Sequence, residues 1–262
     1  MKIEDLRHAR ADQKTPLVCL TAYTAPMAAL LDDIADILLV GDSLAMVLYG
    51  HDTTRNIDLE TMIAHGRAVA RNCRSACVVL DMPYGSYEDS PDQALENASY
   101  AIKQSGCQAV KIEGGQEMAS TAEKLVENNI PVIGHIGLLP QSATEGFHVQ
   151  GRKDAGRTRI IEDAKALQDA GASAIVIECV IQDVANQITQ ELEIPTIGIG
   201  ASSACDGQIL VTEDMLGVTR GKTPRFVRKY ADLGQVIRQA AEEYKKDVLS
   251  GDFPGDDEVY RK

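Results

Sequence analysis

Eight short apolar runs alternate with stretches of helical character along the whole chain. Buried parallel strands have this appearance, because both faces of each strand are covered and no polar alternation remains. Regular alternation of strands and helices favours a (β/α)₈ barrel, and 262 residues is a usual length for that fold. The predicted strands are Leu17–Thr21, Ile37–Val40, Cys77–Leu80, Ala109–Ile112, Val132–Ile136, Ala174–Glu178, Pro195–Ile199 and Ile209–Val211.

The rival architecture is an open, doubly wound sheet with a dinucleotide site. Its fingerprint is a glycine-rich turn after the first strand, whereas here the first strand leads into Ala22-Tyr23-Thr24. Gly198 and Gly200 come late in the chain, and Ser203 stands at the third glycine position. We therefore expect one α/β barrel domain over residues 1–262, with a C-terminal helix and a short acidic tail at Asp252–Glu258.

Helix signals lie between most of these strands. Pro91–Gln104 is the clearest, because Ser90 can cap its start and Gly106 follows its end. The other predicted helices are Met118–Asn128, Thr158–Ala170, Val184–Glu191 and, at the C-terminus, Leu233–Leu249.

The formal net charge of −13 argues against a nucleic-acid partner, which needs a basic surface. Arg152, Lys153, Arg157 and Arg159 form a local basic exception that could meet an anionic ligand, although a solvated helix start is the favoured interpretation. No apolar stretch approaches the roughly 20 residues that span a bilayer, and residues 1–13 lack an apolar signal core. We expect no membrane partner and a cytoplasmic location, in which the six cysteines stay reduced.

Five polar side chains lie at or just past the ends of five consecutive apolar runs. They are Asp42, Asp81, Glu113, His135 and Glu178. In a (β/α)₈ barrel the active site lies at the C-terminal face of the strands, so these side chains should converge on one pocket. The pattern therefore predicts an enzyme and indicates where its site is.

Asp42, Asp81 and Glu113 would place three carboxylates in one small pocket, where they repel one another. A divalent cation would relieve this repulsion, and an oxygen-rich set without thiolates suits Mg²⁺. The alternative is that each carboxylate caps a helix or pairs with an arginine. Ser43 could add a hydroxyl contact to this site or could equally cap the following helix.

Lys111 and Glu113 are two residues apart, so they share one face of their strand. Lys111 could neutralise a substrate carboxylate or a developing oxyanion, and a structural ion pair with Glu113 is compatible with that role. His135 stands between glycines that leave room for a ligand, although a lone histidine near an apolar strand is often a core residue.

Glu178 ends the sixth predicted strand and can act as a general base. A metal bound to a 2-oxo acid acidifies the neighbouring carbon and stabilises the enolate that a base then forms. The combination fits carbon–carbon bond chemistry on a small keto acid. Cys179 lacks an evident activating base, so core packing is the favoured interpretation for it.

A series of motifs follows in chain order: Leu39-Val40-Gly41-Asp42-Ser43-Leu44, Gly50-His51-Asp52-Thr53-Thr54, Leu80-Asp81-Met82-Pro83-Tyr84, Val110-Lys111-Ile112-Glu113-Gly114-Gly115, Gly134-His135-Ile136-Gly137-Leu138-Leu139-Pro140-Gln141, Val149-Gln150-Gly151-Arg152, Ile177-Glu178-Cys179-Val180, Ile197-Gly198-Ile199-Gly200-Ala201 and Asp206-Gly207-Gln208-Ile209-Leu210-Val211. Together, from about Leu20 to Phe226, they resemble the 3-methyl-2-oxobutanoate hydroxymethyltransferase (ketopantoate hydroxymethyltransferase) family.

The resemblance implies a barrel of the phosphoenolpyruvate/pyruvate superfamily. It also implies Mg²⁺-dependent transfer of a hydroxymethyl group from 5,10-methylenetetrahydrofolate to 3-methyl-2-oxobutanoate through a metal-stabilised enolate, giving 2-dehydropantoate for pantothenate and coenzyme A synthesis. Further implications are a homo-oligomer, typically a decamer, and a set of residue roles. In that set Asp42 and Asp81 bind the metal directly and Glu113 binds it through water. The keto acid is contacted by the two aspartates and by Ser43, Lys111 and His135. Glu178 takes the proton from C3 of the keto acid.

Several positions depart from the family pattern without removing a carboxylate, Lys111 or Glu178. They are Thr24, Ala45, Ser202 and the loop Glu145-Gly146-Phe147-His148. Two other functions compete with the transfer. One is a carbon–carbon or carbon–phosphorus lyase of the same superfamily, and the other is a catalytically silent barrel, which would lack a ligand or base that this chain retains.

Overall fold

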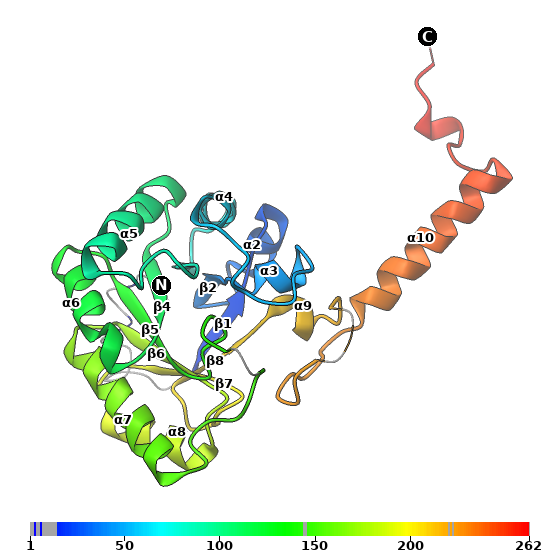
Figure 1. Ribbon diagram of the computed structural model, residues 1–262. Helices are drawn as coiled ribbons and strands as arrows, with labels where there is room; N and C mark the ends of the chain where they lie inside the picture. The colour runs from blue at the N-terminus through cyan, green and yellow to red at the C-terminus, as the bar shows by residue number, and fades with distance from the viewer. Residues whose placement is uncertain are drawn as a thin grey trace. The chain divides into compact units, whose positions relative to one another are not determined.

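The computed structural model describes Ile3, Leu6 and residues 15–143, 146–219, 221 and 223–261. The chain divides into two compact units, Met1–Val211 and Thr212–Lys262. In the first unit, eight parallel strands close into a barrel in sequence order, so the predicted (β/α)₈ fold is confirmed (Figure 1). Helices lie around the outside of the strands.

The strands lie close to their predicted positions. They are β1 (Leu17–Thr21), β2 (Ile37–Val40), β3 (Cys77–Asp81), β4 (Ala109–Glu113), β5 (Val132–Gly137), β6 (Ala174–Glu178), β7 (Thr196–Ile199) and β8 (Gly207–Leu210). β3 and β4 run one residue further than predicted, because Asp81 still pairs with Lys111 and Glu113 with His135. The charged side chains of Asp81 and Glu113 therefore belong to the sheet itself.

The helices of the barrel unit include three that the sequence analysis did not predict: α2 (Ala25–Leu31), α3 (Leu44–Val47) and α4 (Leu59–Ala70). The other elements are α5 (Pro91–Ser105), the 3₁₀ turn η1 (Gln116–Met118), α6 (Ala119–Glu127), α7 (Asp154–Asp169) and α8 (Gln182–Glu191). As predicted, the Ser90 hydroxyl caps α5 and Gly106 ends it with a φ of 79°. The sequence does contain a helix-start signal for α4, because Asp58 caps the helix: its carboxylate accepts a hydrogen bond from the Thr61 N–H.

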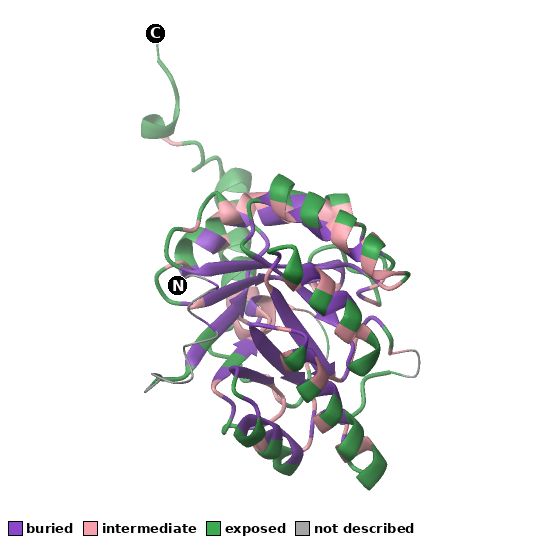
Figure 2. Cartoon of the chain, turned by 90° about the vertical axis from the view of Figure 1, so that its left-hand side faces the viewer, coloured by how far each residue is buried: buried purple, intermediate pink, exposed green. Residues whose placement is uncertain are grey.

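The interior of the barrel changes character along its axis. Alternate residues of each strand point inward, and those near the N-terminal ends are apolar. This core consists of Leu17, Cys19, Ile37, Leu39, Cys77, Val79, Ala109, Ile133, Ala174, Val176, Ile197 and Ile209, with Ile3 and Leu6 packed among them. Nearer the C-terminal ends the buried residues include the polar side chains of Thr21, Asp81, Lys111, Glu113 and His135. Figure 2 shows the buried strands and the exposed outer faces of the helices.

The second unit contains α9 (Thr212–Met215), α10 (Leu233–Ser250) and the 3₁₀ turn η2 (Asp256–Glu258). α10 matches the predicted C-terminal helix within one residue, and none of its residues is buried. Its exposed large apolar residues include Ile237, Tyr244 and Val248, with exposed fractions of 57%, 57% and 45%. In the part of the chain that the structure describes, no helix is long and apolar enough to cross a bilayer.

Candidate active site

The C-terminal ends of β3, β4 and β5 bring the predicted site residues together. In register, Asp81 pairs with Lys111, and Glu113 pairs with His135. The two residues of each pair lie on adjacent strands and face the barrel interior, so their side chains are neighbours. All four are at most 5% exposed. The site is thus a charged layer that lies on top of an apolar core.

Asp42 joins this layer from the segment after β2. Its backbone N–H donates a hydrogen bond of 3.1 Å to Asp81 Oδ2, so the two aspartates are neighbours. Burial and the negative charge of Glu113 raise the pKa of Asp42 above its ordinary value. Burial also raises the pKa of Asp81, to about 7, although Lys111 acts in the opposite direction. The protein therefore holds these carboxyl groups where their ionised forms are costly.

Lys111 provides a positive charge inside this group. Its Nζ lies 2.8 Å from Asp81 Oδ1 and 3.1 Å from His135 Nδ1. Burial lowers the pKa of Lys111, but the surrounding carboxylates outweigh burial and raise it, so the side chain is positively charged. The ion pair that the sequence suggested with Glu113 is formed with Asp81 instead, since these two residues are directly opposite in the ladder.

His135 connects the buried layer to Glu178. Its Nε2 lies 3.1 Å from Glu178 Oε2, and its Nδ1 lies 3.4 Å from Glu113 Oε1. Burial and Lys111 lower the pKa of His135, but Glu113 and Glu178 outweigh them and raise it to about 9. Among the described residues Nε2 makes no hydrogen bond, so its contact with Glu178 is an ion pair when the ring is protonated. His135 is therefore not a plain core residue, because both ring nitrogens contact charged groups.

Glu178 is the most accessible member of the group. Its side chain is 17% exposed, compared with 2% for Glu113. Its register partner is Gly137, whose φ is 94° and where a Cβ would lie 2.4 Å from the Glu178 carbonyl oxygen. Glycine at 137 thus allows the chain to leave β5 close to Glu178. An accessible, oriented carboxylate beside a buried polar layer can remove a proton from a bound molecule.

Two residues of the site were not predicted, Gln141 and Tyr87. Both are 1% exposed. Gln141 Nε2 donates to Asp42 Oδ2 at 3.0 Å, and its backbone N–H donates to Glu113 Oε2 at 3.0 Å. The Tyr87 hydroxyl donates to Gln141 Oε1 at 2.7 Å. Gln141 ends one of the motifs quoted above, but nothing in its local sequence indicates that it reaches Asp42.

Ser43 lies beside Asp42, where the sequence placed it. Its hydroxyl is 2.8 Å from the Tyr23 hydroxyl, and it makes no capping bond to α3. Of the two roles that the sequence left open, helix capping is therefore not the one adopted. The half-buried hydroxyl stays at the edge of the charged layer.

The carboxylates fit a hard divalent cation such as Mg²⁺. Asp42 and Asp81 are adjacent oxygen donors, and Glu113 Oε1 is buried and accepts no hydrogen bond. Among the described residues, no three His, Cys, Asp or Glu side chains form a complete metal-binding set as they stand. Mg²⁺ does not need one, because it is usually held by one or two carboxylates and keeps several waters. The chemistry of these oxygen donors therefore suits a hard divalent cation.

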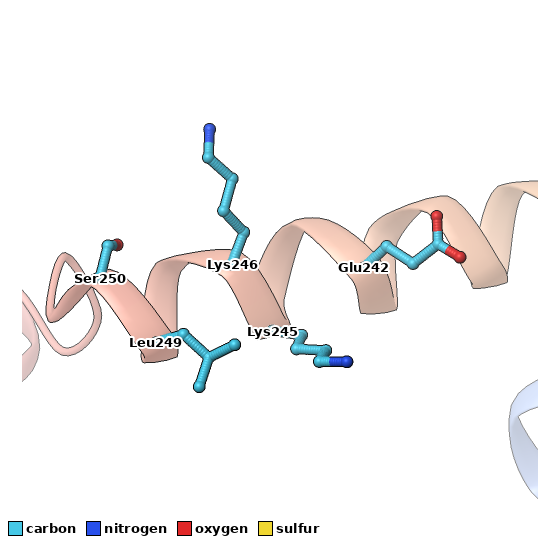
Figure 3. Close-up of a pocket in the computed structure, with 5 residues that line it drawn as sticks. All are labelled: Glu242, Lys245, Lys246, Leu249 and Ser250. Atoms are coloured by element: carbon cyan, nitrogen blue, oxygen red, sulfur yellow. The ribbon is translucent and has the colours of Figure 1, made fainter.

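Two of the hollows formed by the described residues lie outside this layer. A cavity of about 440 Å³ borders the ends of β4 and β5 and the start of α7, and its lining includes Gly137, Leu138, Arg159 and Asp163. The other lies on α10 alone, where Glu242, Lys245, Lys246, Leu249 and Ser250 project from one exposed stretch of helix (Figure 3). Such a surface does not enclose a ligand, so the first of these two hollows is the one that concerns the site.

The structure also tests the expectations for the basic cluster and for Cys179. α7 begins at Asp154, four residues earlier than predicted. Arg152 and Lys153 therefore lie exposed at a helix start, as favoured, whereas Arg157 is half-buried and Arg159 is exposed within the helix. Cys179 is half-buried with a φ of 50°, so the prediction that it packs in the core is wrong. Burial and Glu178 raise the pKa of its thiol to about 11, which keeps it un-ionised and unsuited to be a nucleophile.

The positions that depart from the family pattern lie in different segments of the barrel unit. Thr24 caps α2, since its hydroxyl accepts from the Met27 N–H, and Ala45 is fully buried in α3. The Ser202 hydroxyl bonds to Asn186 on α8. Glu145 of the variant loop lies outside the described residues. Thr24, Ala45 and Ser202 do not displace a member of the charged layer.

Comparison with known proteins identifies the family. A family model described as ketopantoate hydroxymethyltransferase matches residues 1–256. The chain belongs to the ketopantoate hydroxymethyltransferase family. Within this family, a relative from Bordetella petrii named 3-methyl-2-oxobutanoate hydroxymethyltransferase is 52% identical over 257 residues, which cover 97% of this chain and 93% of the relative. A Rhodospirillum rubrum relative with the same name is 48% identical over 99% of this chain and 94% of its own. The resemblance inferred from the motifs is confirmed, and the protein is an enzyme of the transferase class.

Solved structures support the architecture of this ketopantoate hydroxymethyltransferase family member. A putative phosphonomutase from Burkholderia cenocepacia has a TM-score of 0.65 at 13% identity and covers 93% of this chain and 99% of its own. A 2,3-dimethylmalate lyase of the PEP mutase/isocitrate lyase superfamily has a TM-score of 0.61 at 18% identity, covering 98% and 91%. At such low identity these neighbours show the fold alone.

Proposed function

We propose that this protein transfers a hydroxymethyl group from 5,10-methylenetetrahydrofolate to 3-methyl-2-oxobutanoate, giving 2-dehydropantoate in pantothenate synthesis. The relatives' names support the reaction. The observation that carries it is the arrangement of Glu178 on His135, beside buried carboxylates and Lys111. A proton-abstracting carboxylate next to a charged layer is what carbon–carbon bond formation beside a ketone requires.

In this mechanism Asp42 and Asp81 would hold Mg²⁺ directly and Glu113 would hold it through water. Bound there, Mg²⁺ would supply Lewis-acid polarisation of the 2-oxo group. Lys111 would stabilise negative charge that develops on the substrate oxygens, since its ammonium group is fixed 2.8 Å from Asp81. Ser43 would orient the keto acid by a hydrogen bond from beside Asp42, and His135 would contact it from its place between Lys111 and Glu178.

Glu178 would remove the proton from C3 of the keto acid, and C3 would then form a bond to the one-carbon unit of the folate. One water molecule would supply the hydroxyl oxygen while the two C–N bonds of that unit break. The C3 proton and the two water protons would end on the new hydroxyl and on the two nitrogens of the departing tetrahydrofolate. The contact with His135 Nε2 at 3.1 Å would position the Glu178 carboxylate, whose side chain is 17% exposed. The 440 Å³ cavity, which includes the Glu178 register partner Gly137 in its lining, offers space near the base for the folate donor. Arg159 in the same lining supplies a cation for the donor's carboxylates.

We also infer that the chain assembles with itself, into a decamer as the resemblance implies, and works in the cytoplasm. Ile237, Tyr244 and Val248 form an apolar stripe at helical spacing on α10 that its own unit leaves exposed. The six free thiols fit a reducing compartment.

The test is deuterium exchange at C3 of 3-methyl-2-oxobutanoate in D₂O with Mg²⁺, followed by product analysis with the folate donor. Glu178→Gln should lose exchange by at least about 100-fold, the scale of a general base. The matched control is Glu193→Gln, an exposed glutamate that precedes β7 at the opposite end of the barrel. Exchange at the wild-type rate in Glu178→Gln would rule out Glu178 as the base. Turnover that does not need folate would favour the lyase.

A further inference from the structure

We propose that Gln141 is a positioning residue that holds Asp42 and Glu113 in place for a divalent cation, so that its loss weakens cation binding. This inference rests on the proposed function, because it concerns the same cation. Gln141 lies in the segment after β5, whereas Asp42 follows β2, 99 residues earlier in the chain. A single side chain therefore joins two loops on the rim of the barrel.

The contacts of Gln141 use every hydrogen-bonding group of its side chain amide. Nε2 donates to Asp42 Oδ2 and to the Met82 carbonyl oxygen, both at 3.0 Å, and Oε1 accepts from the Tyr87 hydroxyl. The backbone N–H donates separately to Glu113 Oε2. With the residue 1% exposed, water cannot replace a lost partner, so each bond has a high cost of removal.

Tyr87 fixes the direction of the amide. Its hydroxyl accepts a hydrogen bond of 3.1 Å from the Glu113 N–H and donates to Gln141 Oε1. The amide oxygen must therefore face Tyr87, and the NH₂ group must face Asp42. The result is a continuous relay from the Glu113 backbone through Tyr87 and Gln141 to the Asp42 carboxylate, in which successive bonds polarise one another.

The chemistry of the amide suits a cation site. Asp42 and Glu113 are close enough that the charge of Glu113 raises the pKa of Asp42. The side-chain amide donates to Asp42 and the backbone N–H of the same residue donates to Glu113, so neither contact adds a positive charge that would compete with the cation, as a second lysine would. Gln141 thus keeps two mutually repelling groups within reach of one ion, and Glu113 Oε1 makes no hydrogen bond to the described residues.

The experiment is a titration of Mn²⁺, as a paramagnetic substitute for Mg²⁺, into the full chain, with free Mn²⁺ measured by electron paramagnetic resonance. Gln141→Met removes the amide and nearly preserves the side chain's length. We expect the Kd to rise about 10- to 100-fold, the usual effect of losing a partner that orients a metal ligand. Tyr87→Phe should shift the Kd in the same direction by less. Gln187→Met is the control, since it removes an exposed Gln–Glu hydrogen bond on α8 and should leave the Kd unchanged.

Each outcome supports or overturns the positioning role of Gln141. A wild-type protein that does not bind Mn²⁺ overturns the proposed metal and this inference with it. Wild-type binding with an unchanged Kd in folded Gln141→Met overturns the inference alone. If circular dichroism shows that Gln141→Met is unfolded, the Kd of Tyr87→Phe decides, and an unchanged value refutes the positioning role. A general structural role would lower the thermal midpoint in chelator without changing the Kd.

Discussion

The buried ion pair between Lys111 and Asp81 should be strongly coupled. We consider Lys111→Met, Asp81→Asn and the double variant, studied in chelator at pH 8. The two groups lie 2.8 Å apart with side chains 5% and 1% exposed. Removing one partner of such a pair leaves an uncompensated charge, which typically costs about 3–5 kcal/mol of unfolding free energy. Removing both should cost much less than the sum of the single variants.

The loss of unfolding free energy in Lys111→Met has an upper limit, because Asp81 can take up a proton instead of keeping an unpaired charge. Holding neutral a carboxyl whose pKa is about 3.9 in the unfolded chain costs roughly 5–6 kcal/mol at pH 8 and about 1.5 kcal/mol at pH 5. The folded-state pKa of Asp81 is already raised to about 7, and loss of Lys111 would raise it further. The destabilisation is therefore small near the unfolded pKa and grows as pH rises.

The assay is chemical denaturation of the three variants at pH 5 and pH 8. An exposed pair of the same length, Lys165 and Glu191 at 2.7 Å, provides the control, and its coupling should be below about 1 kcal/mol. If the Lys111 and Asp81 variants are additive within about 0.5 kcal/mol at pH 8, the two groups are not coupled and the argument fails. A Lys111→Met penalty that does not fall between pH 8 and pH 5 would equally refute it.

Three further predictions follow from other parts of the molecule. Burial raises the pKa of Asp81 to about 7, so below that pH a cation must displace a proton, and the Mg²⁺ affinity should fall by up to about tenfold per pH unit. Calorimetry in two buffers of different ionisation enthalpy measures the released proton. Equal affinity at pH 6 and pH 8 would contradict this prediction. Asp32→Ala should lower the unfolding free energy by about 1–3 kcal/mol, since the carboxylate accepts backbone hydrogen bonds from residues 74–76; thermal unfolding compared with the wild type checks it. Ile237→Asp on the apolar stripe of α10 should reduce the mass of the assembly in light scattering, whereas Glu242→Gln on the same helix should not, and equal masses would exclude α10 from the interface.

The positions of the strands were largely readable from the sequence. Runs such as Ile37–Val40 and Ala174–Glu178 are apolar without alternation, and such runs are buried on both faces in a barrel. The short helix α3 was not predicted, because its four residues are too few to show a helical period. The start of α7 was placed too late, since its first turn is polar and exposed.

The convergence of the charged side chains was also predictable. Parallel strands in a barrel end on one face, so Asp81, Glu113, His135 and Glu178 had to meet once the strands were assigned. The partners within that group were not predictable. Local periodicity placed Lys111 on the same face as Glu113, but only the register between β3 and β4 set it against Asp81.

The sequence by itself determined the barrel and the end of it that carries the polar site, because burial and side-chain alternation are properties of neighbouring residues along a strand. Only the tertiary structure decided that Gln141 holds Asp42 and Glu113, and that Tyr87 orients its amide. Those contacts join loops that are far apart in the chain, and hydrogen-bond geometry is set by where the closed barrel places each loop, which no local pattern encodes.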